Sequence, residues 1–186
     1  MMDTPPLRHL YVNPVGQCNL ACKHCWISPE RSSQHFETRK RLESEFTSEQ
    51  FIKLLDQTVK LGLKNIKFTG GEPLLRSDFP ELYRIAAEYR DAELVIDIET
   101  NGTLIPDGLL EALEKHPPGQ IAVSLDSIHE QEHDSFRNTQ GAWARTVRFI
   151  KELVKREITT QVIMSTVKLE VEPVLRMALF CQETGV

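Results

Sequence analysis

Three of the four cysteines of this chain lie close together, in the stretch CNLACKHCW. In a reducing compartment, cysteines at such short spacing are more often metal ligands, and their clustering does not resemble a secreted disulfide framework. Cys18, Cys22 and Cys25 therefore predict an iron-sulfur cluster or a zinc ion, with chance clustering of buried thiols as a third interpretation. Zinc would need His24 or a distant group as its fourth ligand. Cys181 lies far along the chain on a predicted helix, so it is a poor fourth ligand.

A cluster held by only three thiolates has one incomplete corner. A four-iron cluster takes one ligand on each iron, so three cysteines leave one iron open. Catalytic zinc sites follow the same principle, because their protein ligands leave one position for water or substrate. The cysteine count therefore allows a chelating molecule from outside the protein to complete the cluster.

The elements that must position these cysteines follow from a regular alternation along the chain. Aromatic and β-branched runs predict strands at 7–13, 65–69, 93–102, 120–127 and 158–167. Apolar residues at helical spacing predict helices at 47–62, 78–89, 107–115, a long helix through 143–154, and 170–183. Five β/α units indicate an α/β fold with a parallel sheet, either open and doubly wound or part of a barrel.

Polar and glycine residues come directly after the predicted strands. In parallel β/α folds the loops after the strands form the ligand face, so we expect these residues to meet the cysteine loop at one rim. They are Gly70, Gly71 and Glu72 after the second strand, Thr100, Asn101 and Gly102 after the third, and Ser124 and Asp126 at the end of the fourth. Glu99, at the third strand end, either faces a substrate or caps the next helix.

Composition excludes several classes of partner. The 186 residues are 40% hydrophobic, which fits one globular domain, and the net charge of -5 argues against electrostatic binding to nucleic acid or to an acidic membrane face. No apolar run is long enough for a signal peptide or a membrane span, so we expect a cytoplasmic protein. The one long irregular stretch is 28–45, and Trp26 is expected to shield the metal site from water.

Together these motifs resemble those of the radical S-adenosylmethionine (radical SAM) enzymes. The shared features are C-x3-C-x2-C at 18, 22 and 25, GGEP at 70–73, TNG at 100–102 and SLDS at 124–127, in that order and at strand ends. The resemblance implies a parallel (β/α) partial TIM-like barrel that usually has six units, of which this chain has five. It implies that residues 1–186 are a radical SAM core domain, truncated at the C-terminus relative to a longer enzyme.

The resemblance also implies roles for individual residues. Cys18, Cys22 and Cys25 would hold a [4Fe-4S] cluster whose open iron binds the amine and carboxylate of S-adenosylmethionine (SAM). Roles in binding SAM itself fall to His24 beside the adenine, to Gly70, Gly71 and Glu72 at the methionyl amine, to Ser124 and Asp126 at the ribose or methionyl end, and to Arg137 at the carboxylate. Asn101 is either a turn residue or a cofactor contact.

The implied activity is reductive cleavage of SAM to a 5'-deoxyadenosyl radical that abstracts hydrogen from a substrate. The motif style resembles the SPASM/twitch-type branch that modifies peptides or proteins, with tetrapyrrole or cofactor biosynthesis as the alternative substrate class. The implied partners are a peptide or small-molecule substrate and an electron donor such as a flavodoxin or ferredoxin. Two other classes stay open, a non-catalytic iron-sulfur protein and a zinc-stabilised interaction module.

Overall fold

The computed structural model describes residues 5–25, 46–166, 168 and 170–186, so Trp26 and the stretch 28–45 lie outside the described residues. The strands are β1 (His9–Val12), β2 (Asn65–Phe68), β3 (Val95–Thr100), β4 (Gln120–Ser124) and β5 (Thr160–Ile163). The α-helices are α1 (Ser48–Lys60), α2 (Phe79–Ala87), α3 (Leu109–Lys115), α4 (Glu130–Arg137), α5 (Ala142–Lys155) and α6 (Val171–Thr184). Two short 3-10 helices, η3 (Pro73–Leu75) and η4 (Glu88–Ala92), complete the described elements.

The strand order decides between the two predicted architectures. Every strand pair is parallel, and the sheet runs β1-β2-β3-β4-β5 in chain order. A doubly wound sheet would reverse its order at a switch point, whereas a barrel adds each strand beside the previous one. The partial-barrel prediction with five β/α units is therefore confirmed. In the described part of the chain β1 and β5 each pair with one strand only, so the sheet is open.

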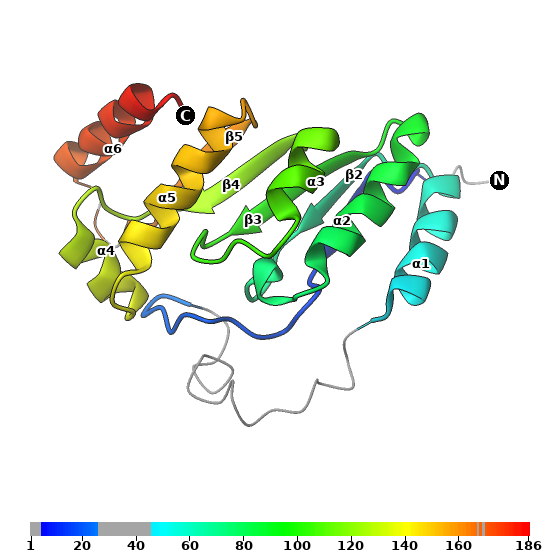
Figure 1. Cartoon of the computed structure of the whole chain (residues 1–186), viewed down its shortest axis with the longest axis horizontal. Helices are drawn as coiled ribbons and strands as arrows, with labels where there is room; N and C mark the ends of the chain where they lie inside the picture. The colour runs from blue at the N-terminus through cyan, green and yellow to red at the C-terminus, as the bar shows by residue number, and fades with distance from the viewer. Residues whose placement is uncertain (1–4, 26–45, 167, 169) are drawn as a thin grey trace.

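One face of the sheet is covered by helices, which stand side by side in Figure 1. The core between this face and the helices contains a row of aromatic rings. The ring centroid of Phe68 in β2 lies 5.8 Å from that of Phe51 in α1 and 5.1 Å from that of Phe79 in α2. All three rings are fully buried. Burial of such large apolar side chains is the main favourable contribution to folding here, and it fixes the sheet against its helices.

The opposite face of the sheet is largely polar over β1 to β3, with Val95 as an exposed apolar exception, and we call Tyr11, Asn65, Lys67, Asp97 and Glu99 on this face the inner wall. Alternation along each strand sends these side chains away from the core. Asn65 donates to Asp97 at 2.8 Å, and the Lys67 ammonium lies 2.9 Å from the Glu99 carboxylate. A filled barrel packs branched apolar side chains at such positions. This wall instead presents polar groups to solvent, with Tyr11 67% exposed.

The start of α1 follows the sequence signals closely. Thr47 accepts the backbone N–H of Gln50 at 3.2 Å, and the Gln50 side chain accepts the Thr47 N–H at 2.9 Å, so the helix begins with a capping box. Phe46 stacks on Phe51 across this start at 5.4 Å, as a hydrophobic staple does. The helix ends at Lys60 with Leu61 as its C-cap, and Gly62, whose φ is +99°, follows in the left-handed region and ends the helical path.

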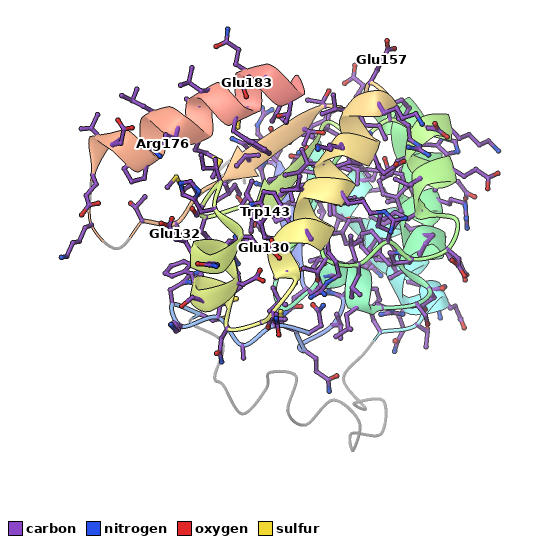
Figure 2. The ribbon with its side chains drawn as sticks, turned by 60° about the vertical axis from the view of Figure 1, so that its left-hand side comes forward. Glu130, Glu132, Trp143, Glu157, Arg176 and Glu183 are labelled. Atoms are coloured by element: carbon purple, nitrogen blue, oxygen red, sulfur yellow. The ribbon has the colours of Figure 1, made fainter. Side chains whose placement is uncertain are left out.

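One helix was missing from the sequence prediction. This helix, α4, packs beside α5. Figure 2 shows the pair, with Glu130 and Glu132 labelled on α4 and Trp143 labelled on α5. The residues that α4 buries are His133 and Arg137, so it has no apolar stripe for periodicity to detect. The predicted strands at 93–102 and 120–127 were also too long, because residues after Thr100 and Ser124 turn away to build loops at the strand ends.

None of the helices in the described ranges is both long enough and apolar enough to cross a membrane.

Candidate functional site

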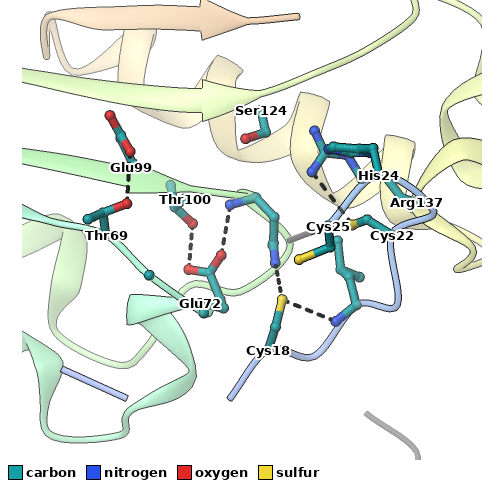
Figure 3. Close-up of a pocket in the computed structure, with 14 residues that line it drawn as sticks. Cys18, Cys22, His24, Cys25, Thr69, Glu72, Glu99, Thr100, Ser124 and Arg137 are labelled. Carbon is teal, nitrogen blue, oxygen red and sulfur yellow. Dashed lines mark hydrogen bonds between the residues drawn. The ribbon is translucent and has the colours of Figure 1, made fainter. Parts of the chain in front are cut away.

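A cavity of about 220 Å³ lies at the carboxyl ends of the strands, where the cysteine loop crosses the sheet (Figure 3). The structure brings together nine of the ten predicted site residues around it, namely Cys18, Cys22, His24, Cys25, Gly70, Gly71, Glu72, Ser124 and Arg137. The tenth, Asp126, does not line the cavity but holds a residue that does. The remaining lining residues are Leu20, Thr69, Glu99, Thr100 and Asn101.

The three clustered cysteines are free thiols in different surroundings. Cys18 and Cys22 are half-buried, and Cys25 is exposed. Burial raises the pKa of Cys18 to about 12, and it also raises the pKa of Cys22, against the opposing charge of Arg137. Without a positive partner such as a metal, both thiols are therefore protonated at neutral pH.

N–H groups point at two of these sulfurs. The Leu20 backbone N–H donates to Cys18 Sγ at 3.4 Å, the Asn101 side-chain amide donates to the same sulfur at 3.7 Å, and the Arg137 guanidinium donates to Cys22 Sγ at 3.7 Å. Donors of this kind stabilise negative charge on sulfur, so they suit thiolates that ligate a metal.

The arrangement of the cysteines bears on the choice of metal. Within the described ranges, no three His, Cys, Asp or Glu side chains are grouped as a single metal ion requires. A mononuclear zinc ion needs its ligands to converge at about 2.0–2.3 Å from one point. A four-iron cluster places each thiolate on a different iron, which suits sulfurs spread around a cavity. The donor set therefore fits the cluster better than zinc.

The glycine turn after β2 packs against the cysteine loop. A Cβ on Gly71 would lie 1.9 Å from the Gln17 carbonyl oxygen, and a Cβ on Gly70, whose φ is +112°, would lie 2.2 Å from the Asn13 side chain. The Glu72 N–H donates to the same Gln17 carbonyl at 2.8 Å. The glycines are thus needed for the approach of the chain's own first loop.

The Glu72 carboxylate is buried and already holds neighbouring loops. It accepts the Leu74 N–H at 3.0 Å and the Thr100 hydroxyl at 2.6 Å on one oxygen, and the Asn101 N–H at 2.7 Å on the other. Burial raises its pKa, while these donors oppose the shift. Three of its acceptor positions are filled, so the predicted contact with the methionyl amine would use the remaining one.

Arg137 reaches the cavity from the end of α4 and is held there by Asp126. Its Nε lies 2.5 Å from Asp126 Oδ2, and the other oxygen of Asp126 accepts the Ser165 N–H at 3.1 Å. The buried His133 accepts the Asp126 N–H at 3.2 Å, and burial lowers its pKa, which favours the neutral ring that this bond requires. Asp126 therefore acts on the site through Arg137.

His24 stacks on Phe136 of α4, with ring centroids 4.4 Å apart and planes 10° from parallel. Burial lowers the His24 pKa, which favours the uncharged ring. The neutral, flat ring at the cavity edge is compatible with the predicted place beside the adenine, which stays a prediction. Phe136 was missed by the sequence analysis because a lone aromatic on a polar helix carries no positional signal.

The structure bears on two alternatives that the sequence left open. Glu99 lines the cavity and bonds Lys67 and Thr69, so it faces the site and does not cap a helix. Asn101 is a turn residue, because its side-chain oxygen accepts the Thr103 N–H at 2.9 Å, as in an Asx turn. Its amide nitrogen faces Cys18, and its contact with the cofactor stays a prediction.

The burial of Cys18 predicts slow alkylation in the metal-free protein. Because the thiolate is the nucleophile, a pKa raised to about 12 makes Cys18 react at least about tenfold more slowly at pH 8 than in the same chain unfolded in urea. Iodoacetamide labelling followed by peptide mass spectrometry measures this, with the exposed Cys25 as the internal reference. Equal rates for Cys18 in folded and unfolded chains would contradict the described burial.

Replacing Gly71 by Ala should separate the glycine turn from the cysteine loop. The added Cβ would meet backbone that cannot rotate away. We therefore expect the free energy of unfolding of the metal-free chain, measured in urea, to fall by about 1–3 kcal/mol. Gly16→Ala is the matched control, because a Cβ there has no atom within 4 Å. Equal effects of the two substitutions would show that the close packing is absent.

Residues 12–180 match the radical SAM superfamily. The "AdoMet-dependent heme synthase" of Methanosarcina barkeri is 29% identical over 168 residues, which are 90% of this chain and 45% of that protein. The "Antilisterial bacteriocin subtilosin biosynthesis protein AlbA" of Bacillus subtilis is 31% identical over 184 residues, 98% of this chain and 38% of that protein. This chain thus spans less than half the length of either curated relative.

Solved structures share the fold. Streptococcus suis SuiB bound to S-adenosylmethionine superposes with a TM-score of 0.79 at 18% identity, over 96% of this chain and 38% of that one. SuiB bound to its precursor peptide SuiA superposes with a TM-score of 0.78. Given the extent of the superfamily match, which takes in the cysteine loop and all the strand ends that line the cavity, this chain belongs to the radical SAM superfamily.

Proposed function

We propose that this chain is the core of a radical SAM enzyme that cleaves SAM reductively to a 5'-deoxyadenosyl radical, which abstracts hydrogen from a substrate. The superfamily's cofactors, a [4Fe-4S] cluster and S-adenosylmethionine, are the cofactors of this chain. The observation that carries the proposal is the single cavity in which the three cysteines meet the Gly70–Gly71 turn and Arg137. The proposal concerns the shared core, because the curated relatives are more than twice as long.

The chain's own residues supply binding, orientation and charge. Cys18, Cys22 and Cys25 would hold the cluster on three corners and leave the fourth iron to SAM. The Arg137 guanidinium has Nη groups beyond the Nε that bonds Asp126, which suits the SAM carboxylate. His24 stacked on Phe136 would flank the adenine, and Ser124 would contact the ribose or methionyl end.

The charge of the inner wall supports a peptide as the substrate. Among the five described strands, Lys67 is the only lysine or arginine, and it is already bonded to Glu99. Asp97 adds a second carboxylate on the same face, paired with neutral donors. Such a wall suits the N–H groups of a peptide better than the several carboxylates of a tetrapyrrole.

The relatives support two substrate classes. AlbA is named for bacteriocin biosynthesis and SuiB was solved with a precursor peptide, which supports peptide or protein modification as the first. The heme synthase relative supports tetrapyrrole chemistry as the second. For either substrate, the proposed partner for reduction is a one-electron donor such as a flavodoxin or ferredoxin. The net charge of -5 favours neither nucleic acid nor an acidic membrane as a partner.

The activity is tested by anaerobic reconstitution with iron and sulfide, reduction with dithionite, and quantification of 5'-deoxyadenosine from SAM. We expect product from the reconstituted chain and only the no-enzyme background from Cys22→Ala, because the cluster loses a ligand. Cys181→Ala is the matched control and should retain product. A chain that binds iron without cleaving SAM would be a non-catalytic iron-sulfur protein, and about one zinc without iron would indicate the interaction module.

The inner-wall charge predicts a preference among peptides of opposite charge. Fluorescence anisotropy with two labelled decapeptides, one lysine-rich and one glutamate-rich, should show about threefold tighter binding of the cationic peptide, as expected for a partly exposed charge pair. Glu99→Gln should bring the dissociation constants of the two peptides closer together, since it removes one carboxylate and keeps the side-chain shape. Tight binding of coproporphyrin III with no peptide binding would instead favour the tetrapyrrole alternative.

A further inference from the structure

Asn101 is the only uncharged side chain in the described cavity that donates a hydrogen bond to a cysteine sulfur. Its Nδ2 lies 3.7 Å from Cys18 Sγ, and the Leu20 backbone N–H reaches the same sulfur at 3.4 Å. Dashed lines in Figure 3 mark both bonds. Cys18 therefore receives two N–H groups from two different loops.

The orientation of the Asn101 amide is fixed by its neighbours. Its Oδ1 accepts the Thr103 backbone N–H at 2.9 Å, and a backbone N–H can only donate. The oxygen must therefore face Thr103, which leaves the NH2 group facing Cys18 and Asn19. One hydrogen goes to Asn19 Oδ1 at 2.9 Å, so the other is directed at the sulfur.

A closed ring of hydrogen bonds holds this arrangement. Asn19 donates from its own amide to Thr103 Oγ1 at 2.8 Å, and Thr103 Oγ1 donates to Asn101 Oδ1 at 2.6 Å. Asn101 and Thr103 are both buried, and Glu72 accepts the Asn101 backbone N–H at 2.7 Å. A donor that is buried and held on three sides keeps its direction whether the sulfur carries more or less negative charge.

We propose that Asn101 is a positioning residue that sets the reduction potential of the cluster through its N–H···S bond to Cys18. This inference rests on the proposed function, in which Cys18 is a cluster ligand. When an external one-electron reductant reduces the cluster, negative charge grows on the cluster and its thiolates. A donor fixed on Cys18 stabilises that reduced form more than the oxidised form, so it raises the midpoint potential.

Arg137 donates to Cys22 but is a poorer site for this test. Its guanidinium forms an ion pair with Asp126 and is also assigned to the SAM carboxylate. A substitution there would therefore change the local charge, the packing around Asp126 and SAM binding at once. Asn101 is uncharged and bonds the sulfur in the absence of SAM. Its contribution to the potential is therefore measurable in SAM-free protein.

The test is a redox titration of the anaerobically reconstituted full chain without SAM, monitored by electron paramagnetic resonance. Asn101→Ala should shift the reduction equilibrium about tenfold toward the oxidised cluster, which is about 59 mV in midpoint potential for one electron. Asn101→Asp keeps the acceptor for Thr103 and replaces the donor with an acceptor, so it should lower the potential further. An unchanged midpoint in both variants would overturn the proposal.

Thr146→Val is the matched control for a purely structural effect. Thr146 donates to the backbone carbonyl of the same Asn101 at 2.8 Å and is fully buried, and among the described residues its hydroxyl makes no hydrogen bond to a cysteine sulfur. Its replacement should leave the midpoint potential unchanged. A shift equal to that of Asn101→Ala would mean that loop distortion, and not the N–H···S bond, alters the potential.

A measurement on the unsubstituted protein covers the case in which the variants fail to bind iron. Protein labelled with 15N in its asparagine side chains should show a 15N hyperfine coupling to the reduced cluster in SAM-free samples. Absence of this coupling would overturn the inference. If the unsubstituted chain forms no reducible cluster at all, the proposed function itself fails, which is a different and recognisable result.

Discussion

The buried carboxylate of Glu72 is the interaction on which the rest of the site depends. It binds the Thr100 hydroxyl and the Asn101 N–H at the end of β3, and its own backbone N–H binds Gln17 in the cysteine loop. Burying a carboxylate is costly unless it is hydrogen-bonded, and this one has three donors. One residue, through its side chain and its backbone N–H together, therefore ties the cysteine loop, the glycine turn and the third strand end into a single rim.

That rim orders the site before any cofactor binds. The amide of Asn101 and the guanidinium of Arg137 already point at Cys18 and Cys22, each held by partners behind it. Groups fixed in advance need no reorganisation when charge appears on the sulfurs. The polar inner wall continues from the same rim, so bound cofactor and substrate would share one open face of the sheet.

The sequence predicted the alternation of elements and the loops that line the cavity, because cysteine spacing and strand-end glycines are local signals, whereas His24 and Arg137 were implied only by the family resemblance. The sequence did not decide between a partial barrel and a doubly wound sheet, since that choice depends on which strands pair. Helix α4 escaped detection because it buries His133 and Arg137 in place of apolar residues. The role of Gly71 was only partly foreseen: its closest neighbour is Gln17, far away in sequence.

The proposed function depends most on a cluster whose fourth iron is left to SAM by a loop with three cysteine ligands. Electron-nuclear double resonance on the reduced, reconstituted chain, with SAM labelled by 15N at the methionyl amine and 17O at the carboxylate, tests this most directly. Coordination at the open iron predicts strong couplings from both labels. Couplings no larger than those of distant solvent nuclei, from a cluster with all four irons ligated by the protein, would contradict the account.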